Sequence, residues 1–252
     1  MSACEAPSVS EVNETFERTA EVAAATPAFS VEALETDLQT LMAHYNVPGL
    51  SFAVIEAGEI VHVSGLGIGN LSEAKVVDAD TRFRAGSVTK QFAAALVGIA
   101  AHRTDLSLYD PITDHLPVEP GHALFTTPPI RVRELLTHAA GFGNMDGSLV
   151  FFPVRDQADM LARLDHLSLI STPGDSFAYS NVGYTLAGMI AANALGAEDA
   201  FDDVLAEQIL SPRNLSRSAR DLSGMEGDDN VAQGYAMAGE IAVPVEYEEM
   251  KA

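Results

Sequence analysis

The chain has 252 residues, of which 47% are hydrophobic and 20% charged, a composition that indicates a globular protein with a substantial core. Its 36 acidic residues against 14 lysines and arginines give a formal net charge of −22, which argues against nucleic acid or an anionic membrane as a partner. The sequence shows neither an apolar run long enough for a transmembrane helix nor a secretory signal at its start, so we expect a cytoplasmic protein.

The acidic excess has two interpretations. The first is an ordinary acidic protein surface. The second is a halophilic adaptation, in which carboxylates hold water while dissolved ions in a salt-rich cytoplasm screen their mutual repulsion. The dependence of the melting temperature on salt concentration distinguishes the two.

The first elements expected along the chain are helical. Residues 1–29 form an acidic, alanine-rich extension in which 11–25 has the pattern of a short helix. A second helix is expected from Ser30, a candidate N-cap, to about Asn46, because apolar residues recur at helical spacing between them.

A β-hairpin is predicted next. Two strand-like runs, 50–56 and 60–66, flank a turn that contains a glycine. We expect the alternating glycines Gly65, Gly67 and Gly69 to form a loop after the hairpin.

The remainder of the chain is expected to be almost wholly helical up to Leu210, apart from a loop at 173–181. One hairpin beside about six helices leaves two possibilities, because a two-stranded sheet is only marginally stable: the fold is helical with an added hairpin, or the rest of a sheet is missing. The expected helices cover 91–102, a short stretch within 106–117, 131–141, 156–164, 182–196 and 200–210.

The pair Ser87 and Lys90 is the first candidate for chemistry. Residues three apart at the start of a helix lie on one face. A serine hydroxyl becomes a nucleophile when a base takes its proton, and a lysine nearby can assist. The alternative is structural, with Ser87 as an N-cap and Lys90 as a solvated cation.

Tyr179 and Asn181 form the second candidate group, at the junction of a loop and a helix. A tyrosine beside an amine can relay a proton, and an asparagine can orient that amine or bind an amide of the substrate. The structural alternatives are a loop anchor for Tyr179 and an N-cap for Asn181.

The order of these motifs resembles that of the serine β-lactamase and penicillin-binding protein superfamily, in the branch of class C β-lactamases, D-Ala-D-Ala carboxypeptidases and esterases. The resemblance runs from about Ser30 to about Tyr235. It rests on the segments V-P-G-L-S-F-A-V-I, T-R-F-R-A-G-S-V-T-K-Q-F, D-P-I-T-D-H-L-P, I-R-V-R-E-L-L-T-H-A-A-G-F, P-G-D-S-F-A-Y-S-N-V-G-Y-T-L-A-G and I-L-S-P-R-N-L.

The resemblance implies a β-lactamase/transpeptidase-like α+β fold, with a helical subdomain and an antiparallel sheet of which only the N-terminal hairpin is clearly present. Residues 30–252 would be the N-terminal portion of that domain. The implied catalytic residues are Ser87 as the acylated nucleophile, Lys90 as its activator and Tyr179 as a proton shuttle, with Asn181 binding the substrate's amide or the lysine. His138 matches a family segment usually written H-T-S-G, which here reads H-A-A-G, and is expected to be structural.

One family motif was not found. The family carries Lys or His, then Thr or Ser, then Gly, on a strand that also supplies the second oxyanion N–H, and no such triplet follows Asn181.

We therefore expect a serine hydrolase acting on an ester, amide or peptide whose activity is weak unless a continuation, a partner chain or a second copy completes the sheet. The alternative is a catalytically inactive truncated homologue or binding module. No metal and no cofactor are expected, because the seven histidines are scattered and no nucleotide-binding loop is present.

Overall fold

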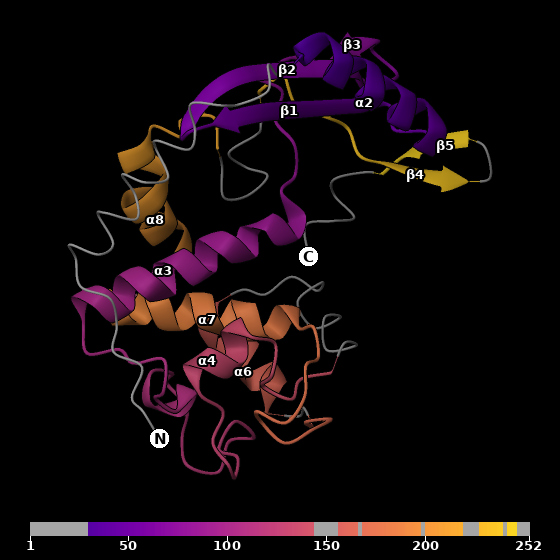
Figure 1. Ribbon diagram of the computed structural model, residues 1–252. Helices are drawn as coiled ribbons and strands as arrows, with labels where there is room; N and C mark the ends of the chain where they lie inside the picture. Colours follow the sequence, from indigo (N-terminus) through magenta and orange to yellow (C-terminus); the bar gives the residue numbers. More distant parts are fainter. Residues whose placement is uncertain are drawn as a thin grey trace, which may run out of the picture. The chain divides into compact units, whose positions relative to one another are not determined.

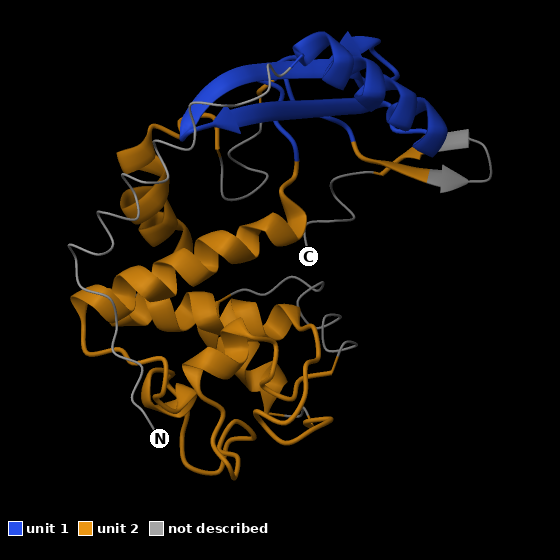
Figure 2. Cartoon of the chain, in the orientation of Figure 1, with its two compact units in different colours: residues 1–83, 229–233 blue, residues 84–228, 234–252 orange. Residues whose placement is uncertain are grey.

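The computed structural model describes residues 30–143, 156–165, 168–197, 200–218, 227–238 and 241–245. The expected N-terminal extension at 1–29, with its helix at 11–25, lies outside these residues. The chain divides into two compact units, residues 1–83 with 229–233 and residues 84–228 with 234–252 (Figure 2).

Unit 1 is a small antiparallel sheet with one helix. Its strand order is β1-β2-β3, and β1 pairs with β2 from Gly49 opposite Gly67 to Glu56 opposite Glu59, with an irregularity between Val54 and Ile55. The predicted hairpin is thereby confirmed. The elements are α2 (Val31–Tyr45), β1 (Gly49–Glu56), β2 (Glu59–Asn70) and β3 (Lys75–Val76), all labelled in Figure 1.

The ends of α2 follow from local side-chain chemistry. The Ser30 hydroxyl accepts a hydrogen bond from the Ala33 N–H at 3.2 Å, which satisfies one free donor of the first turn. At the other end Asn46 adopts the left-handed conformation, which asparagine tolerates well, and its N–H donates to the Met42 carbonyl. The predicted helix and its N-cap are therefore confirmed.

The expectation of a loop at Gly65, Gly67 and Gly69 was wrong, because all three lie in β2. A Cβ atom at Gly65 would come within 2.5 Å of the Val77 carbonyl. A Cβ at Gly67 would come within 2.2 Å of the Pro48 carbonyl oxygen. The glycines thus let neighbouring backbone approach the strand closely, and they do not end it.

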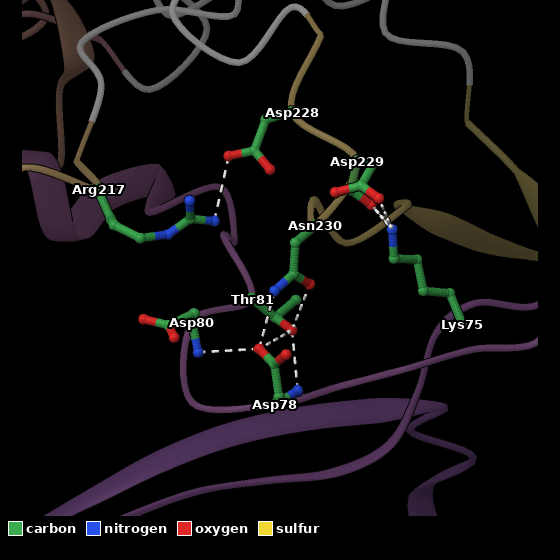
Figure 3. A network of polar contacts seen from close by, with 8 residues as sticks. All are labelled: Lys75, Asp78, Asp80, Thr81, Arg217, Asp228, Asp229 and Asn230. Atoms are coloured by element: carbon green, nitrogen blue, oxygen red, sulfur yellow. Dashed lines mark hydrogen bonds and ion pairs between the residues drawn. The ribbon is translucent and has the colours of Figure 1, made fainter.

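Residues 229–233 belong to unit 1 although they come late in the chain. The Arg82 N–H donates to the Asn230 carbonyl at 2.9 Å, and the Gln233 N–H donates to the Gly69 carbonyl at 2.8 Å. Lys75 donates to the Asp229 backbone carbonyl and forms an ion pair with its carboxylate at 3.2 Å (Figure 3).

The Asp78 carboxylate is the centre of the polar network that holds this late segment (Figure 3). One of its oxygens accepts hydrogen bonds from the Asn230 amide at 2.8 Å, the Asp80 N–H at 2.9 Å and the Thr81 hydroxyl at 3.0 Å. The bonds from Asn230 and then Thr81 hold the pKa of Asp78 below its ordinary value. The ionised form of Asp78 therefore ties two distant parts of the chain together.

Unit 2 is predominantly helical and contains the large apolar core. Most of its predicted helices are present, with small shifts at their ends. The elements are η2 (Gly86–Val88), α3 (Thr89–Arg103), η3 (Ile112–Asp114), α4 (Val132–Leu136), α6 (Gln157–Leu164), α7 (Asn181–Ala194), α8 (Phe201–Leu205), a π-helical turn η5 (Ala206–Leu210), η6 (Ser211–Arg213), and the strands β4 (Tyr235–Ala238) and β5 (Ile241–Pro244).

The helices α3 and α7 lie side by side and form the centre of this core (Figure 1). On α3 the buried residues recur at positions i, i+3, i+4 and i+7, the period of one helix face. On α7 burial extends over more of the surface, as expected of a central helix. The buried residues are Ala93, Leu96, Val97 and Ala100 on α3, with Val182, Leu186, Ala187, Ile190 and Ala191 among those on α7.

One expectation for unit 2 needs correction. The helix predicted for 131–141 ends at Leu136, because His138 has a positive φ of 57° and turns the chain out of the helix. The sequence indicated only the N-terminal hairpin clearly, and the structure adds an antiparallel pairing of β4 with β5 after the helices. Within the described ranges no helix is long and apolar enough to cross a membrane.

Candidate active site

Ser87 lies in the single turn η2 that leads into α3. Gly86 has a φ of +51°, a conformation that glycine adopts readily, so the chain can turn immediately before the serine. In a 3₁₀ turn the side chains at i and i+3 nearly eclipse each other. The Lys90 ammonium accordingly donates to the Ser87 hydroxyl oxygen at 3.4 Å, a long hydrogen bond.

The segment Tyr179–Ser180–Asn181 presents two side chains to the same place. Ser180 is extended, with φ −140° and ψ 127°, and side chains two apart in extended backbone point the same way. Ser180 itself is buried and caps α7, since its hydroxyl accepts from the Gly183 N–H at 3.1 Å. The alternative that Asn181 is the N-cap is therefore wrong, and its side chain is available for another contact.

That contact is with Lys90. The Lys90 ammonium donates to the Asn181 amide oxygen at 2.6 Å and lies 4.7 Å from the centre of the Tyr179 ring. The Tyr179 hydroxyl lies 2.5 Å from the Ser87 hydroxyl. The structure thus brings all four predicted residues together within unit 2, while their chemical roles stay a prediction.

The electrostatics of the cluster lower the pKa of Tyr179. The Lys90 ammonium, and after it the hydrogen bond from Ser87, hold the pKa of the Tyr179 phenol below its ordinary value. The phenol of Tyr184, by contrast, has its pKa raised, first by burial and then by the nearby Tyr179. The pKa values of the two tyrosines near Lys90 are therefore shifted in opposite directions, and the hydroxyl of Tyr179 is the one that contacts the Ser87 hydroxyl.

The H-A-A-G segment supports the loop that carries Tyr179. The Ala178 N–H donates to the His138 carbonyl at 2.7 Å, and the Gly174 N–H donates to the Ala139 carbonyl at 2.8 Å. The His138 ring accepts from the Ser180 N–H at 3.1 Å through Nδ1. Sequence reasoning placed His138 in a structural role, and it gave no sign that this role is to hold the segment next to the candidate nucleophile.

Gly141 closes this segment for a steric reason. Its φ of +89° is in the region that favours glycine, and a Cβ there would come within 2.3 Å of the Ser171 carbonyl oxygen. The Ile170 N–H donates to the Gly141 carbonyl at 2.8 Å. A residue without a side chain is therefore needed where 138–141 runs beside 170–174.

No metal ligand set emerges in the part of the chain that the structure describes, where no cluster of three or more His, Cys, Asp or Glu side chains could hold an ion. The cation of the candidate site is Lys90 itself.

Comparison with solved structures identifies the class of fold. An octameric penicillin-binding protein homologue from Pyrococcus abyssi matches with a TM-score of 0.73 at 28% identity, over 86% of this chain and 50% of that chain. A class C beta-lactamase matches with a TM-score of 0.69 at 26% identity, over 88% of this chain and 59% of that one. The expected β-lactamase/transpeptidase-like α+β fold is therefore confirmed.

The family follows from the sequence comparison. The family model for beta-lactamase matches residues 34–246, so the chain belongs to the beta-lactamase family. A beta-lactamase from Pseudomonas fluorescens is 29% identical over 211 residues, which cover 82% of this chain and 55% of that protein. The chain thus spans about half the length of these relatives.

Proposed function

We propose that this chain carries the acylation site of a serine hydrolase that acts on an ester or amide through an acyl-enzyme. The observation that carries the proposal is the contact of 2.5 Å between the Ser87 and Tyr179 hydroxyls, with the Lys90 ammonium beside both. Membership of the beta-lactamase family supports the same class of reaction.

The proposed step is nucleophilic attack by Ser87 on a carbonyl carbon. As the Ser87 oxygen forms its bond to that carbon, its proton passes to the Tyr179 phenolate, whose charge the Lys90 ammonium stabilises. When the tetrahedral intermediate collapses, the bond to the leaving oxygen or nitrogen breaks and Tyr179 returns the proton to it. Water then hydrolyses the ester on Ser87 by the same route in reverse.

Asn181 has two proposed roles that involve one amide group. Its oxygen accepts from Lys90 at 2.6 Å and fixes the ammonium in place. Its NH₂ group would donate to a carbonyl of the substrate, because an amide has separate donor and acceptor atoms. We therefore assign substrate binding to Asn181, as the resemblance implies.

A second candidate, a binding module without catalysis, is favoured by one observation. The Lys-or-His, Thr-or-Ser, Gly triplet of the family does not occur among residues 182–252. Loss of one oxyanion donor alone lowers a rate by roughly 10²–10³. A continuation, a partner chain or a second copy that supplies this strand would restore full activity, and residues 30–252 would then be the N-terminal portion of a larger catalytic domain.

The substrate and the compartment are proposed only as classes. We propose a cytoplasmic esterase or peptidase-like hydrolase whose substrates are small esters, amides or peptides. Neither nucleic acid nor an anionic membrane is proposed as a partner, because the net charge of −22 repels both.

The proposal is tested by covalent labelling of the folded chain with a fluorescent penicillin and, separately, with a fluorescent phosphonate. We expect a stable adduct in the natural sequence and none in Ser87→Ala. Ser107→Ala in the same unit serves as the matched control and should label normally. A folded sample that takes neither reagent would leave the binding module as the better account.

A further inference from the structure

We propose that His138 is a positioning residue of the candidate active site, whose neutral ring holds the Ser180 backbone so that Tyr179 and Asn181 both face Lys90. This inference rests on the proposed acyl-transfer function only in the use that it gives to the positioned Tyr179 and Asn181. Its test measures the ionisation of Tyr179 and needs no turnover.

His138 holds the segment that carries Tyr179 by two hydrogen bonds. Its backbone carbonyl accepts from the Ala178 N–H at 2.7 Å, and its ring Nδ1 accepts from the Ser180 N–H at 3.1 Å. The residue between these two donors is Tyr179. One residue therefore fixes the backbone immediately before and after the phenol.

The hydrogen bond from the Ser180 N–H to His138 affects two contacts of Lys90 together. Because Ser180 is extended, rotation or displacement of its peptide would move Tyr179 and Asn181 together. These are the residues whose ring and amide oxygen the Lys90 ammonium contacts, at 4.7 Å and 2.6 Å. An error of about 1 Å in such an arrangement is enough to lose much of its effect.

The His138 ring packs on aromatic side chains of the candidate site. The His138 ring centre lies 4.6 Å from that of Tyr179, 5.0 Å from that of Tyr184 and 5.5 Å from that of Phe177. Tyr184 is itself fixed by a hydrogen bond from its hydroxyl to the Leu136 carbonyl at 2.9 Å. The imidazole therefore lies among the aromatic rings of the site.

The chemistry requires a neutral imidazole with its proton on Nε2. A ring nitrogen that accepts a hydrogen bond carries no proton, and a protonated Nδ1 would oppose the Ser180 N–H with a second donor. Burial, and after it the charge of Lys90, hold the pKa of His138 below its ordinary value. The titratable groups that face the ring are Lys90, Tyr179 and Tyr184, and the positive charge of Lys90 opposes a second positive charge on the imidazole.

A matched pair of variants separates positioning from simple packing. His138→Asn keeps an acceptor near Nδ1 and suits the positive φ of 57°, while it loses the ring. His138→Phe keeps a ring of similar size and loses the acceptor. The chain has six tyrosines, so ring-labelled tyrosine and NMR resolve their titrations, and Tyr179→Phe identifies the Tyr179 signal.

We expect Tyr179 to titrate below its ordinary pKa in the natural sequence and in His138→Asn, and to shift upward in His138→Phe. An unchanged titration in folded His138→Phe would overturn the proposal, as would an upward shift in folded His138→Asn. Because Tyr179 ionises whether or not Ser87 is acylated, a chain that takes no label still tests His138.

A measurement without any substitution covers the case in which a variant does not fold. Nitrogen-15 chemical shifts of labelled histidine report which ring nitrogen carries the proton. We expect His138 to be neutral at pH 7 with the proton on Nε2. A proton on Nδ1, or a charged ring at that pH, would contradict the proposed grip on Ser180.

Discussion

The hydroxyl oxygens of Ser87 and Tyr179 lie 2.5 Å apart although the two residues are separated by 92 positions in the chain. Ser87 is fixed by the turn before α3, and Tyr179 by the segment before α7. Because α3 and α7 pack on each other, the same core that stabilises unit 2 sets this distance. The geometry of the candidate site therefore depends on the apolar core.

Tyr179→Phe removes the phenol oxygen and keeps the ring beside Lys90. We expect the rate of labelling of Ser87 to fall by about 10²–10⁴, the usual contribution of a positioned acid–base group. Stability should change little, because the ring contacts with His138 remain. Tyr45→Phe, at an exposed tyrosine of unit 1, is the control and should label at the natural rate. Equal rates for both variants would remove Tyr179 from the mechanism.

The sequence predicted well those elements whose ends are determined by residues next to them in the chain. The N-cap Ser30, the glycine turn of the first hairpin and Gly196, with its φ of +77°, after α7 act through their immediate neighbours. The glycines of β2 were wrongly predicted to form a loop. Glycine is needed there because Val77 and Pro48, which are distant in the sequence, approach the strand closely. The β4–β5 hairpin was missed because strands of four residues leave too short a pattern.

The site was predictable in part for the same reason. Ser87 and Lys90 are adjacent on one turn, and Tyr179 and Asn181 on one extended segment, so each pair is visible locally. The meeting of the two pairs came from the family resemblance and not from spacing. The grip of His138 on Ser180 could not be foreseen, because it depends on a positive φ that no local signal indicates for a histidine.

Gly141→Ala should destabilise unit 2. The substitution places a Cβ 2.3 Å from the Ser171 carbonyl oxygen and leaves an alanine at a φ of +89°, so we expect a loss of about 1–3 kcal/mol in the free energy of unfolding. Chemical denaturation measures it. Gly121→Ala is the matched control, since Gly121 also has a positive φ but has nothing within 4 Å of its Cβ position. If the two variants lose equal stability, the close approach at Gly141 has no energetic weight.

Asp78→Asn should destabilise the protein at neutral pH and much less in acid. The pKa of Asp78 is lowered in the folded chain, so its ionised form contributes stability above the ordinary value of 3.8, and this contribution is lost as the pH falls through the lower folded value. The difference in unfolding free energy between the natural sequence and the variant should therefore shrink below about pH 4. Urea denaturation over a pH series measures this difference.

Glu73→Gln provides the control for that series. It removes one exposed carboxylate from unit 1, where the recorded hydrogen bond of Glu73 uses its backbone N–H and not its side chain. If the unfolding free energies of Asp78→Asn and Glu73→Gln change with pH in parallel, the effect of Asp78→Asn comes from the change in net charge and not from the hydrogen bonds of Asp78.

The halophilic interpretation predicts that salt stabilises the chain. At a net charge of −22 the carboxylates repel one another, and the screening length falls from about 10 Å at 0.1 M salt to about 3 Å at 1 M. The melting temperature should therefore rise from low to molar potassium chloride, and sodium chloride should act similarly. A melting temperature that stays flat over this range would favour the ordinary acidic surface.

The central claim is that the Ser87 hydroxyl is the nucleophile, and peptide mapping of the phosphonate-treated chain by mass spectrometry tests it most directly. The account predicts a single adduct on the peptide that contains Ser87, formed much more slowly in Lys90→Met. An adduct on any other residue, or a rate that does not depend on Lys90, would contradict it.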